Sequence, residues 1–301
     1  MSVIRQSFIP GSQWVYIKLY TGEKTADDIL NKAIAPVLKK VQKEKAIEKW
    51  FFIRYSDPDF HLRIRLLVFD IQFIGKILRL FYRKLNRWNK DHLLWNVQLD
   101  TYKREMERYG NHMIEETESL FYADSECILS IIKKLNGNDN YRWMIALKLI
   151  HELLSDFGLN LDEKQKLTEI LSKSYKTEFG FNEFNSKQFN AKFRENKKIV
   201  ESVLNNTLQE KEFISLFPFI NKRSKELTPI VKQIKIKSNK EKNVNELLQS
   251  YLHMMLNRLF RSKNRQHEML LYDFMFRYYT SEIAKAKYNR NKDDEDQAIT
   301  K

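Results

Sequence analysis

Three basic side chains occupy alternate positions in the segment HLRIRL. They are His61, Arg63 and Arg65, and leucine or isoleucine fills the positions between and after them. Residues two apart in a strand point to the same side, so the basic side chains share one face. Arginine forks bind carboxylates bidentately, and histidine can transfer a proton near neutral pH. The pattern indicates either a cationic site for an anionic ligand or a sheet with one solvated face, which is common in antiparallel sheets.

A second charged segment, TYKREMERYG, follows a strand-like stretch at 101–110. On a helix, Arg104 and Arg108 would share a face one turn apart. Glu105 and Glu107 are their neighbours in sequence, so the alternative is an ion-paired, solvated turn.

The third segment, ELLQSYLHMMLNRLF at 246–260, is apolar on nearly every side of a helix, which predicts burial. His253 would then lie inside, although a lone histidine on such a helix is more often a hydrogen-bonded core residue than a catalyst. A buried Arg258 would need an anionic or carbonyl partner. Together the three segments supply the groups needed to remove a proton α to a carbonyl and to expel a carboxylate.

The strands needed to position these residues are concentrated in the first third of the chain. Strands are predicted at 14–22, on both sides of a turn within 50–69, and at 95–100. Helices are predicted from an N-cap at Thr25 to about Glu48, and then at 71–90, 114–135, 141–157, 162–175, 187–204, 244–262 and 265–286. This segregation predicts an α+β fold, in which a small, mostly antiparallel sheet packs with a predominantly helical remainder.

Domain boundaries are marked by polar and basic segments. We expect one domain over 1–286, followed by a polar, disordered tail at 287–301. The basic segment 221–243 contains Pro229 and is expected to form a surface connection or a short strand.

Composition excludes several classes of protein and site. Cys127 is the only cysteine, so no disulfide can form within the chain. The six histidines form no close ligand pair and no nucleotide-binding glycine motif is present, so we expect neither a metal nor a cofactor. No apolar run approaches the ~20 residues that cross a bilayer, so we expect a cytoplasmic protein without membrane insertion. The net charge of +14 suits an anionic partner or reflects a lysine-rich background composition.

The order of the motifs resembles the C-terminal elimination domain of lantibiotic dehydratases, also called the thiopeptide-type bacteriocin biosynthesis domain. The resemblance covers roughly residues 8–281 and is carried by WVYIKLYTG, TADDIL, WFFIRYSDPDFHLRIR, TYKREMERYG, DFGL and YLHMMLNRLF. Each motif alone is weak, but six in order make the match specific. One departure is Asn111 after Gly110, where the family often has a second glycine.

The resemblance implies a lyase that needs no cofactor. Such domains eliminate glutamate from glutamylated Ser or Thr of a ribosomal precursor peptide, which leaves dehydroalanine or dehydrobutyrine in lanthipeptide and thiopeptide-type biosynthesis. Nothing in the chain resembles the glutamylation domain, so the expected partners are the glutamylated peptide and a separate glutamylating dehydratase subunit. The family also suggests a homodimer.

The resemblance also assigns residues to the site. It implies elimination roles for Arg63, Arg65, His253 and either Arg104 or Arg108, with His253 as base or acid. Arg258, which matches an arginine of the same helix motif, and His61, on the cationic face, are expected to bind substrate.

Two other functions stay open. Some relatives join dehydroamino acids in a cycloaddition that builds the pyridine ring of thiopeptides. A non-catalytic partner that binds peptide or tRNA would instead depend on the basic segment 222–242. Retention of the Arg/His set favours elimination.

Overall fold

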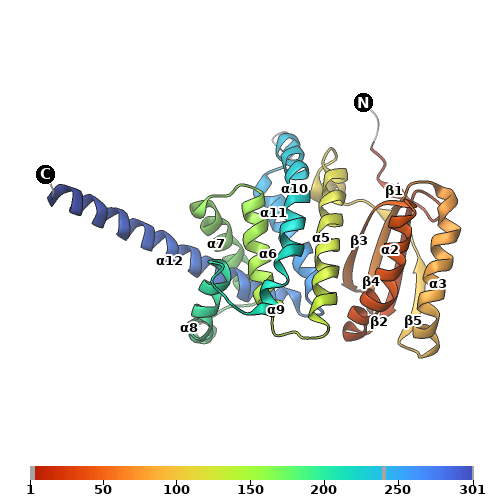
Figure 1. The fold of residues 1–301 in the computed structure, drawn as a ribbon, viewed down its shortest axis with the longest axis horizontal. Coiled ribbons are helices and arrows are strands. Elements are labelled where there is room, and N and C mark those ends of the chain that lie inside the picture. Colours follow the sequence, from red (N-terminus) through yellow and green to blue (C-terminus); the bar gives the residue numbers. More distant parts are fainter. Residues whose placement is uncertain (1–3, 239–241, 300–301) are drawn as a thin grey trace. The chain divides into compact units, whose positions relative to one another are not determined.

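The computed structural model describes residues 4–238 and 242–299 (Figure 1). The chain forms two compact units. The first contains Met1–Asp139 and Ser215–Ser262, and the second contains Asn140–Ile214 and Lys263–Lys301. The predicted division into a domain over 1–286 and a tail at 287–301 stays a prediction.

The first unit is built on an antiparallel four-stranded sheet with the order β3-β4-β2-β5. Its strands are β2 (Trp14–Thr21), β3 (Ile47–Ser56), β4 (Phe60–Val68) and β5 (Leu94–Leu99). A second, two-stranded sheet pairs β1 (Ser7–Phe8) with β6 (Tyr102–Lys103). The predicted strands and the α+β class are therefore confirmed.

One face of the large sheet is apolar and is covered by helices. The helices are α1 (Glu23–Ile29), the π-helical η1 (Leu30–Ile34), α2 (Ala35–Lys43) and α3 (Ile74–Lys90). The short 3-10 helix η2 (Ile71–Phe73) leads into α3 and buries no residue. On this face Leu62, Ile64 and Leu66 are completely buried. The predicted cap at Thr25 is wrong, because the first helix begins at Glu23 and its N-cap is Gly22 without a side-chain bond.

The first unit also contains α4 (Met106–Tyr109), α5 (Ile114–Leu135), α10 (Phe217–Ser238) and α11 (Val244–Leu259). Helices α5 and α11 pack against β3, and α10 packs against α5. The connection or strand predicted at 221–243 is wrong over 221–238, which is helical with Pro229 inside the helix. A buried stripe that includes Leu227, Val231 and Ile234 accounts for this, since its packing outweighs the cost of the proline. Residues 239–241 lie outside the described residues.

The second unit consists of helices. They are α6 (Arg142–Asp156), α7 (Leu161–Glu178), α8 (Glu183–Leu204), α9 (Lys211–Ile214) and α12 (Asn264–Ile299). Asn160 and Glu163 form a capping box at the start of α7, which fixes that boundary. Helix α12 extends past its predicted end at residue 286 to Ile299.

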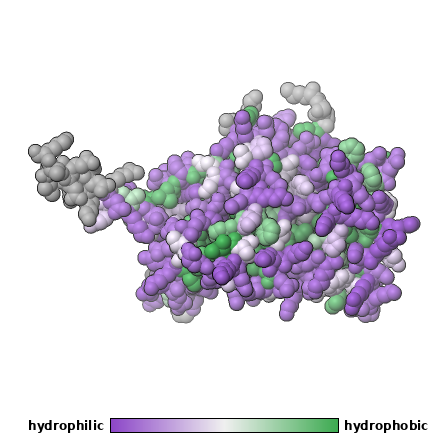
Figure 2. Space-filling model, viewed as in Figure 1, coloured by the Kyte–Doolittle hydropathy of each residue, from purple (hydrophilic) through white to green (hydrophobic). Residues whose placement is uncertain are grey.

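The surface agrees with a charged, globular protein. The face shown in Figure 2 is covered mainly by hydrophilic residues, with smaller hydrophobic areas between them. Among the described residues, no helix is both long and apolar enough to span a membrane.

Candidate functional site

The second face of the sheet carries the basic side chains of β4, which lies between β2 and β3. Register pairs each of them with a residue on both neighbouring strands. The neighbours are Tyr16, Lys18 and Tyr20 on β2, and Phe51, Ile53 and Tyr55 on β3. We call His61, Arg63 and Arg65 the cationic row. Its shared face confirms the alternation in the sequence.

Arg65 lies among aromatic rings and is only 8% exposed. Its Cζ atom is 4.5 Å from the ring centre of Tyr16, 4.9 Å from that of Tyr102 and 5.3 Å from that of Phe51. These rings attract the cation but accept no strong hydrogen bond. The buried Nε has no hydrogen-bond partner in the described structure. The solvated face considered from the sequence is therefore wrong at this position, and the guanidinium keeps donor capacity for an anion.

His61 and Arg63 hold each other in place. His61 Nδ1 lies 2.8 Å from the carbonyl oxygen of Asp59, and Arg63 Nε donates to His61 Nε2 at 3.0 Å. Since Nε2 accepts, Nδ1 carries the proton. Burial and the charge of Arg63 lower the pKa of His61, which favours this neutral form. The arrangement fits a positioning role for His61, and its predicted contact with substrate stays a prediction.

Aromatic stacking completes this end of the cationic row. The ring of His61 stacks on Tyr20, with centroids 4.5 Å apart. The guanidinium of Arg63 covers the ring of Tyr55, with Cζ 3.4 Å from its centre. Both arrangements restrict the side chains without adding a negative charge.

Lys18 is a cation of this face that the candidate site did not include. Its Nζ lies 2.5 Å from Oδ2 of Asp100. The hydrogen bond raises the pKa of Lys18 and lowers that of Asp100. Lys18 and Tyr16 are two apart in the strand predicted at 14–22, so alternation places them on one face, and this was the available signal. The pairing with Asp100 depends on the register of β2 with β5, which the sequence does not reveal.

Arg104 is a buried, fully engaged cation. Its Nε and Nη2 donate to the two carboxylate oxygens of Glu118 at 2.7 and 2.8 Å, and Nη1 donates to the carbonyl oxygen of Arg5 at 3.1 Å. Glu118 also accepts from the hydroxyl of Tyr102 at 2.9 Å. The predicted helical face shared with Arg108 is wrong, because Arg104 precedes α4 and lies just after β6. Glu118 was missed, since nothing local in the sequence links it to Arg104.

Arg108 remains accessible. Its side chain is 39% exposed, and its Nη1 is 3.5 Å from Glu105 Oε2. Its Nε donates to the hydroxyl of Ser250 on α11 at 3.1 Å. Of the two arginines in the TYKREMERYG segment, Arg108 is thus the one whose guanidinium is open to a ligand.

His253 is half-buried on the same stripe of α11 as Ser250 and Asn257. Residues three and four apart on a helix are neighbours, so His253 lies one turn from each. Asn257 bonds the backbone N–H and C=O of Arg54 on β3, both at 2.9 Å. Helix α11 therefore places His253 between Ser250, which Arg108 contacts, and Asn257, which bonds the edge strand β3.

Arg258 points into the core. It is completely buried, and its Nε donates to the carbonyl oxygen of Phe52 at 2.8 Å. Its Nη1 lies 3.8 Å from Asp124 Oδ2, and its Cζ is 4.5 Å from the ring centre of Phe121. Burial lowers its pKa to about 10. This packing argues against the predicted contact with substrate, which stays a prediction.

Comparison with known proteins shows the family of the chain. Residues 14–279 match the family model described as "Lantibiotic biosynthesis dehydratase C-term". The chain belongs to this family. It is 30% identical over 142 residues to the nisin biosynthesis protein NisB of Lactococcus lactis subsp. lactis, which covers 46% of the chain and 14% of NisB. It is 24% identical over 284 residues to the epidermin biosynthesis protein EpiB of Staphylococcus epidermidis, which covers 91% of the chain and 26% of EpiB.

The fold recurs in solved structures. The tRNA-dependent lantibiotic dehydratase MibB from Microbispora sp. 107891 matches 93% of the chain and 29% of its own, with a TM-score of 0.71 and 19% identity. The pyridine synthase TbtD from thiomuracin biosynthesis matches 89% of the chain and 99% of its own, with a TM-score of 0.65 and 10% identity. The matched regions thus span 14% of NisB, 26% of EpiB and nearly all of TbtD.

Proposed function

We propose that this protein is a lyase that eliminates glutamate from glutamylated Ser or Thr of a ribosomal precursor peptide. The products are free glutamate and a dehydroalanine or dehydrobutyrine residue. The observation that carries this proposal is that two arginines keep donor capacity for a ligand, and that one of them contacts the helix that bears a half-buried histidine. Arg65 is buried with an unbonded Nε, Arg108 is exposed, and α11 places His253 beside the residue that Arg108 contacts.

The reaction separates charge in a way that these residues can follow. Removal of the α proton leaves an electron pair that forms the Cα=Cβ bond. The Cβ–O ester bond breaks, and glutamate departs with the bonding pair as a carboxylate. Arginine forks stabilise both the enolate-like state and the leaving carboxylate. His253 either accepts the α proton or protonates the departing glutamate, and each role is general acid–base catalysis.

The other cations have supporting roles in this proposal. Arg63 is oriented by His61 and Tyr55 and faces the same side as Arg65. Arg104 is neutralised by Glu118, so it positions Tyr102 under the guanidinium of Arg65 and makes no contact with substrate. This arrangement supports Arg108, rather than Arg104, as the arginine of this segment that contacts substrate.

Mass spectrometry of a synthetic peptide with a glutamyl ester on serine tests the proposal. We expect the peptide to lose the whole glutamic acid and to gain a dehydroalanine after incubation with the protein. A peptide that keeps its ester would contradict the proposal.

The ring-forming reaction is the second candidate, and the similarity to TbtD over nearly the whole of both chains favours it over a purely binding role. A peptide that already contains two dehydroalanines distinguishes the two reactions. A cyclase would convert it to a product with a pyridine ring, whereas the proposed lyase would leave it unchanged.

A further inference from the structure

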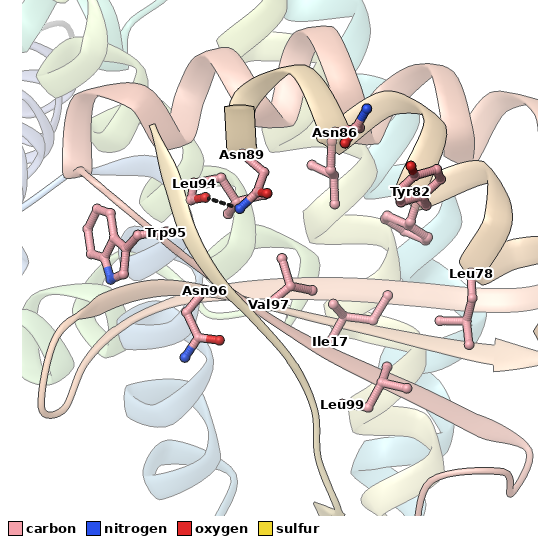
Figure 3. A pocket seen from close by; sticks show the side chains of 12 residues that line it. Ile17, Leu78, Tyr82, Asn86, Asn89, Leu94, Trp95, Asn96, Val97 and Leu99 are labelled. Atoms are coloured by element: carbon pink, nitrogen blue, oxygen red, sulfur yellow. Dashed lines mark hydrogen bonds between the residues drawn. The ribbon is translucent and has the colours of Figure 1, made fainter. Parts of the chain in front are cut away.

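A cavity of about 420 Å³ lies between α3 and β5. Ile17 on β2 lines it, so it opens on the sheet face opposite the cationic row. Figure 3 shows Val97 and Ile17 between the strands and the helix, with Leu78, Tyr82 and Asn86 on the helical side. The proposed elimination uses none of these residues.

One wall of this cavity is an unpaired strand edge. In the described sheet β5 pairs with β2 alone, so its outer backbone groups bond no other strand. Trp95, Val97 and Leu99 alternate along it and are 51%, 47% and 47% exposed. Exposed edges with apolar side chains are templates for another extended chain, and soluble proteins normally protect them.

The opposite wall is a strongly basic helix. Helix α3 carries Lys76, Arg79, Arg83, Lys84, Arg87 and Lys90, and it has no acidic residue. Lys76 pairs with Glu44 at 3.0 Å and Arg87 with Asp91 at 3.6 Å. Arg79 and Arg83 are exposed and form no ion pair in the described structure. With 3.6 residues per turn, Arg79 and Arg83 lie on the part of the α3 surface that adjoins the cavity-lining face, next to Asn86 around the helix axis.

We propose that this groove binds an extended, acidic segment of the peptide substrate as an added strand on β5. Its apolar side chains, at every second position, would enter between α3 and β5, and its carboxylates would reach Arg79 and Arg83. The groove and the cationic row lie on opposite faces of the sheet, so this segment is separate from the residues that are modified. That the ligand is the substrate rests on the proposed function, whereas its acidic, extended character rests on the groove.

A nucleic acid fits these features less well. Phosphates would suit the arginines of α3, but a nucleic acid has no backbone donors and acceptors spaced for a strand edge. Trp95 and Tyr82 are aromatic and can stack on a base, but Val97 and Leu99 beside them on the strand are aliphatic and offer no continuous stacking platform. The groove therefore favours a peptide.

Fluorescence anisotropy with a labelled peptide of about ten residues, alternating leucine with aspartate or glutamate, tests the groove directly. The full chain should bind this probe, and binding should fall at least tenfold when lysine replaces the acidic residues. In an added strand, only every second amide donates to the edge of the sheet, so the probe has two sets of alternate amides. N-methylation of the set that faces β5 removes these donors and should weaken binding by a similar factor, whereas N-methylation of the other set should not.

Paired variants locate the site. Arg79→Glu with Arg83→Glu should lower affinity about tenfold or more. Lys197→Glu with Lys198→Glu makes the same change of charge at exposed positions on α8 and should leave affinity unchanged. Equal losses of affinity in the two double variants would overturn the proposal. Probe binding that N-methylation weakens in neither register would also overturn it. Binding of tRNA in place of the probe, lost in the α3 variant, would also overturn it.

A turnover assay keeps this proposal apart from the proposed function. A short glutamyl-ester peptide is compared with the same peptide fused to the alternating acidic segment. A lower KM for the fused peptide, abolished by the α3 double variant, supports the groove. Elimination with identical KM for both peptides overturns the groove and leaves the lyase intact. Probe binding at α3 without any elimination overturns the lyase and leaves the groove as a peptide site.

Discussion

Two buried charges, Asp273 in the second unit and Arg65 in the first, have different surroundings. In the second unit, Asp273 is 1% exposed and is held by Lys176 and by Arg277, the latter at 2.7 Å. In the first unit, the buried guanidinium of Arg65 faces aromatic rings and keeps an unbonded Nε. Matched charges are typical of a structural role, whereas a buried cation that lacks an acid is costly unless an anionic ligand arrives. The comparison therefore separates a scaffold from a site.

The largest effect is expected from His253→Ala. Loss of the general acid or base should slow elimination by roughly 10²–10⁴-fold. The side chain is half-buried, so the melting temperature should change little. Initial rates of dehydroalanine formation measure the effect, with a thermal melt as the control for folding. A folded variant with the normal rate would remove His253 from the mechanism.

Arg65→Lys sharpens the comparison because it preserves the charge. An ammonium group lacks the planar fork that binds a carboxylate bidentately, so kcat should fall roughly 10²–10³-fold. Arg277→Lys in the second unit is the matched control and should leave kcat unchanged. Equal losses of kcat in the two variants would mean that the aromatic setting of Arg65 has no special role.

Asp273→Asn is expected to affect stability and not turnover. It removes the buried negative charge that holds Lys176 and Arg277 and replaces one of the two acceptor oxygens with an NH2 donor, although both cations are partly exposed and can gain water. The free energy of unfolding should fall by about 1–3 kcal/mol. Urea titration measures this loss, and kcat measured below the unfolding transition should match the unchanged protein. A large fall in kcat would show that the second unit also shapes the site.

The smallest effect is a dependence of stability on pH in the second unit. Burial lowers the pKa of His151 to about 4, and its Nδ1 lies 3.0 Å from the hydroxyl of Tyr279. In the unfolded chain the imidazole of His151 is protonated near pH 6.5, whereas in the folded chain it stays neutral down to about pH 4. Its contribution to the free energy of unfolding is therefore complete above pH 6.5 and is lost as the pH falls toward 4. The loss should reach about 1 kcal/mol by roughly pH 5.5. His151→Phe should flatten this part of the curve of unfolding free energy against pH, and an unchanged slope would exclude His151 as its origin.

Much of the architecture could be predicted from periodicity. The alternation of HLRIRL gave the correct shared face, and the helix predicted at 114–135 is α5. The segment 221–238 was misjudged because its basic residues and Pro229 hid a buried stripe that becomes visible only when α5 packs against it. Local signals identify elements, but tertiary packing decides such ambiguous segments.

The site was harder to predict because its chemistry depends on partners that are distant in sequence. Arg104 and Arg108 are equivalent by local pattern, and only Glu118 on α5 distinguishes the engaged arginine from the accessible one. The aromatic surroundings of Arg65 come from β2, β3 and β6 together. Strand register and long-range packing determine both the contrast between Arg104 and Arg108 and the surroundings of Arg65, and neither can be deduced from a single sequence.

The most direct test of the account uses a peptide with a glutamyl ester on a serine that carries deuterium at Cα. Mass spectrometry should show free glutamate and a dehydroalanine that has lost the deuterium, because elimination breaks the Cα–D bond. A serine that retains deuterium would indicate simple ester hydrolysis, and an untouched ester would indicate no reaction. Either of these results would contradict elimination at the cationic row.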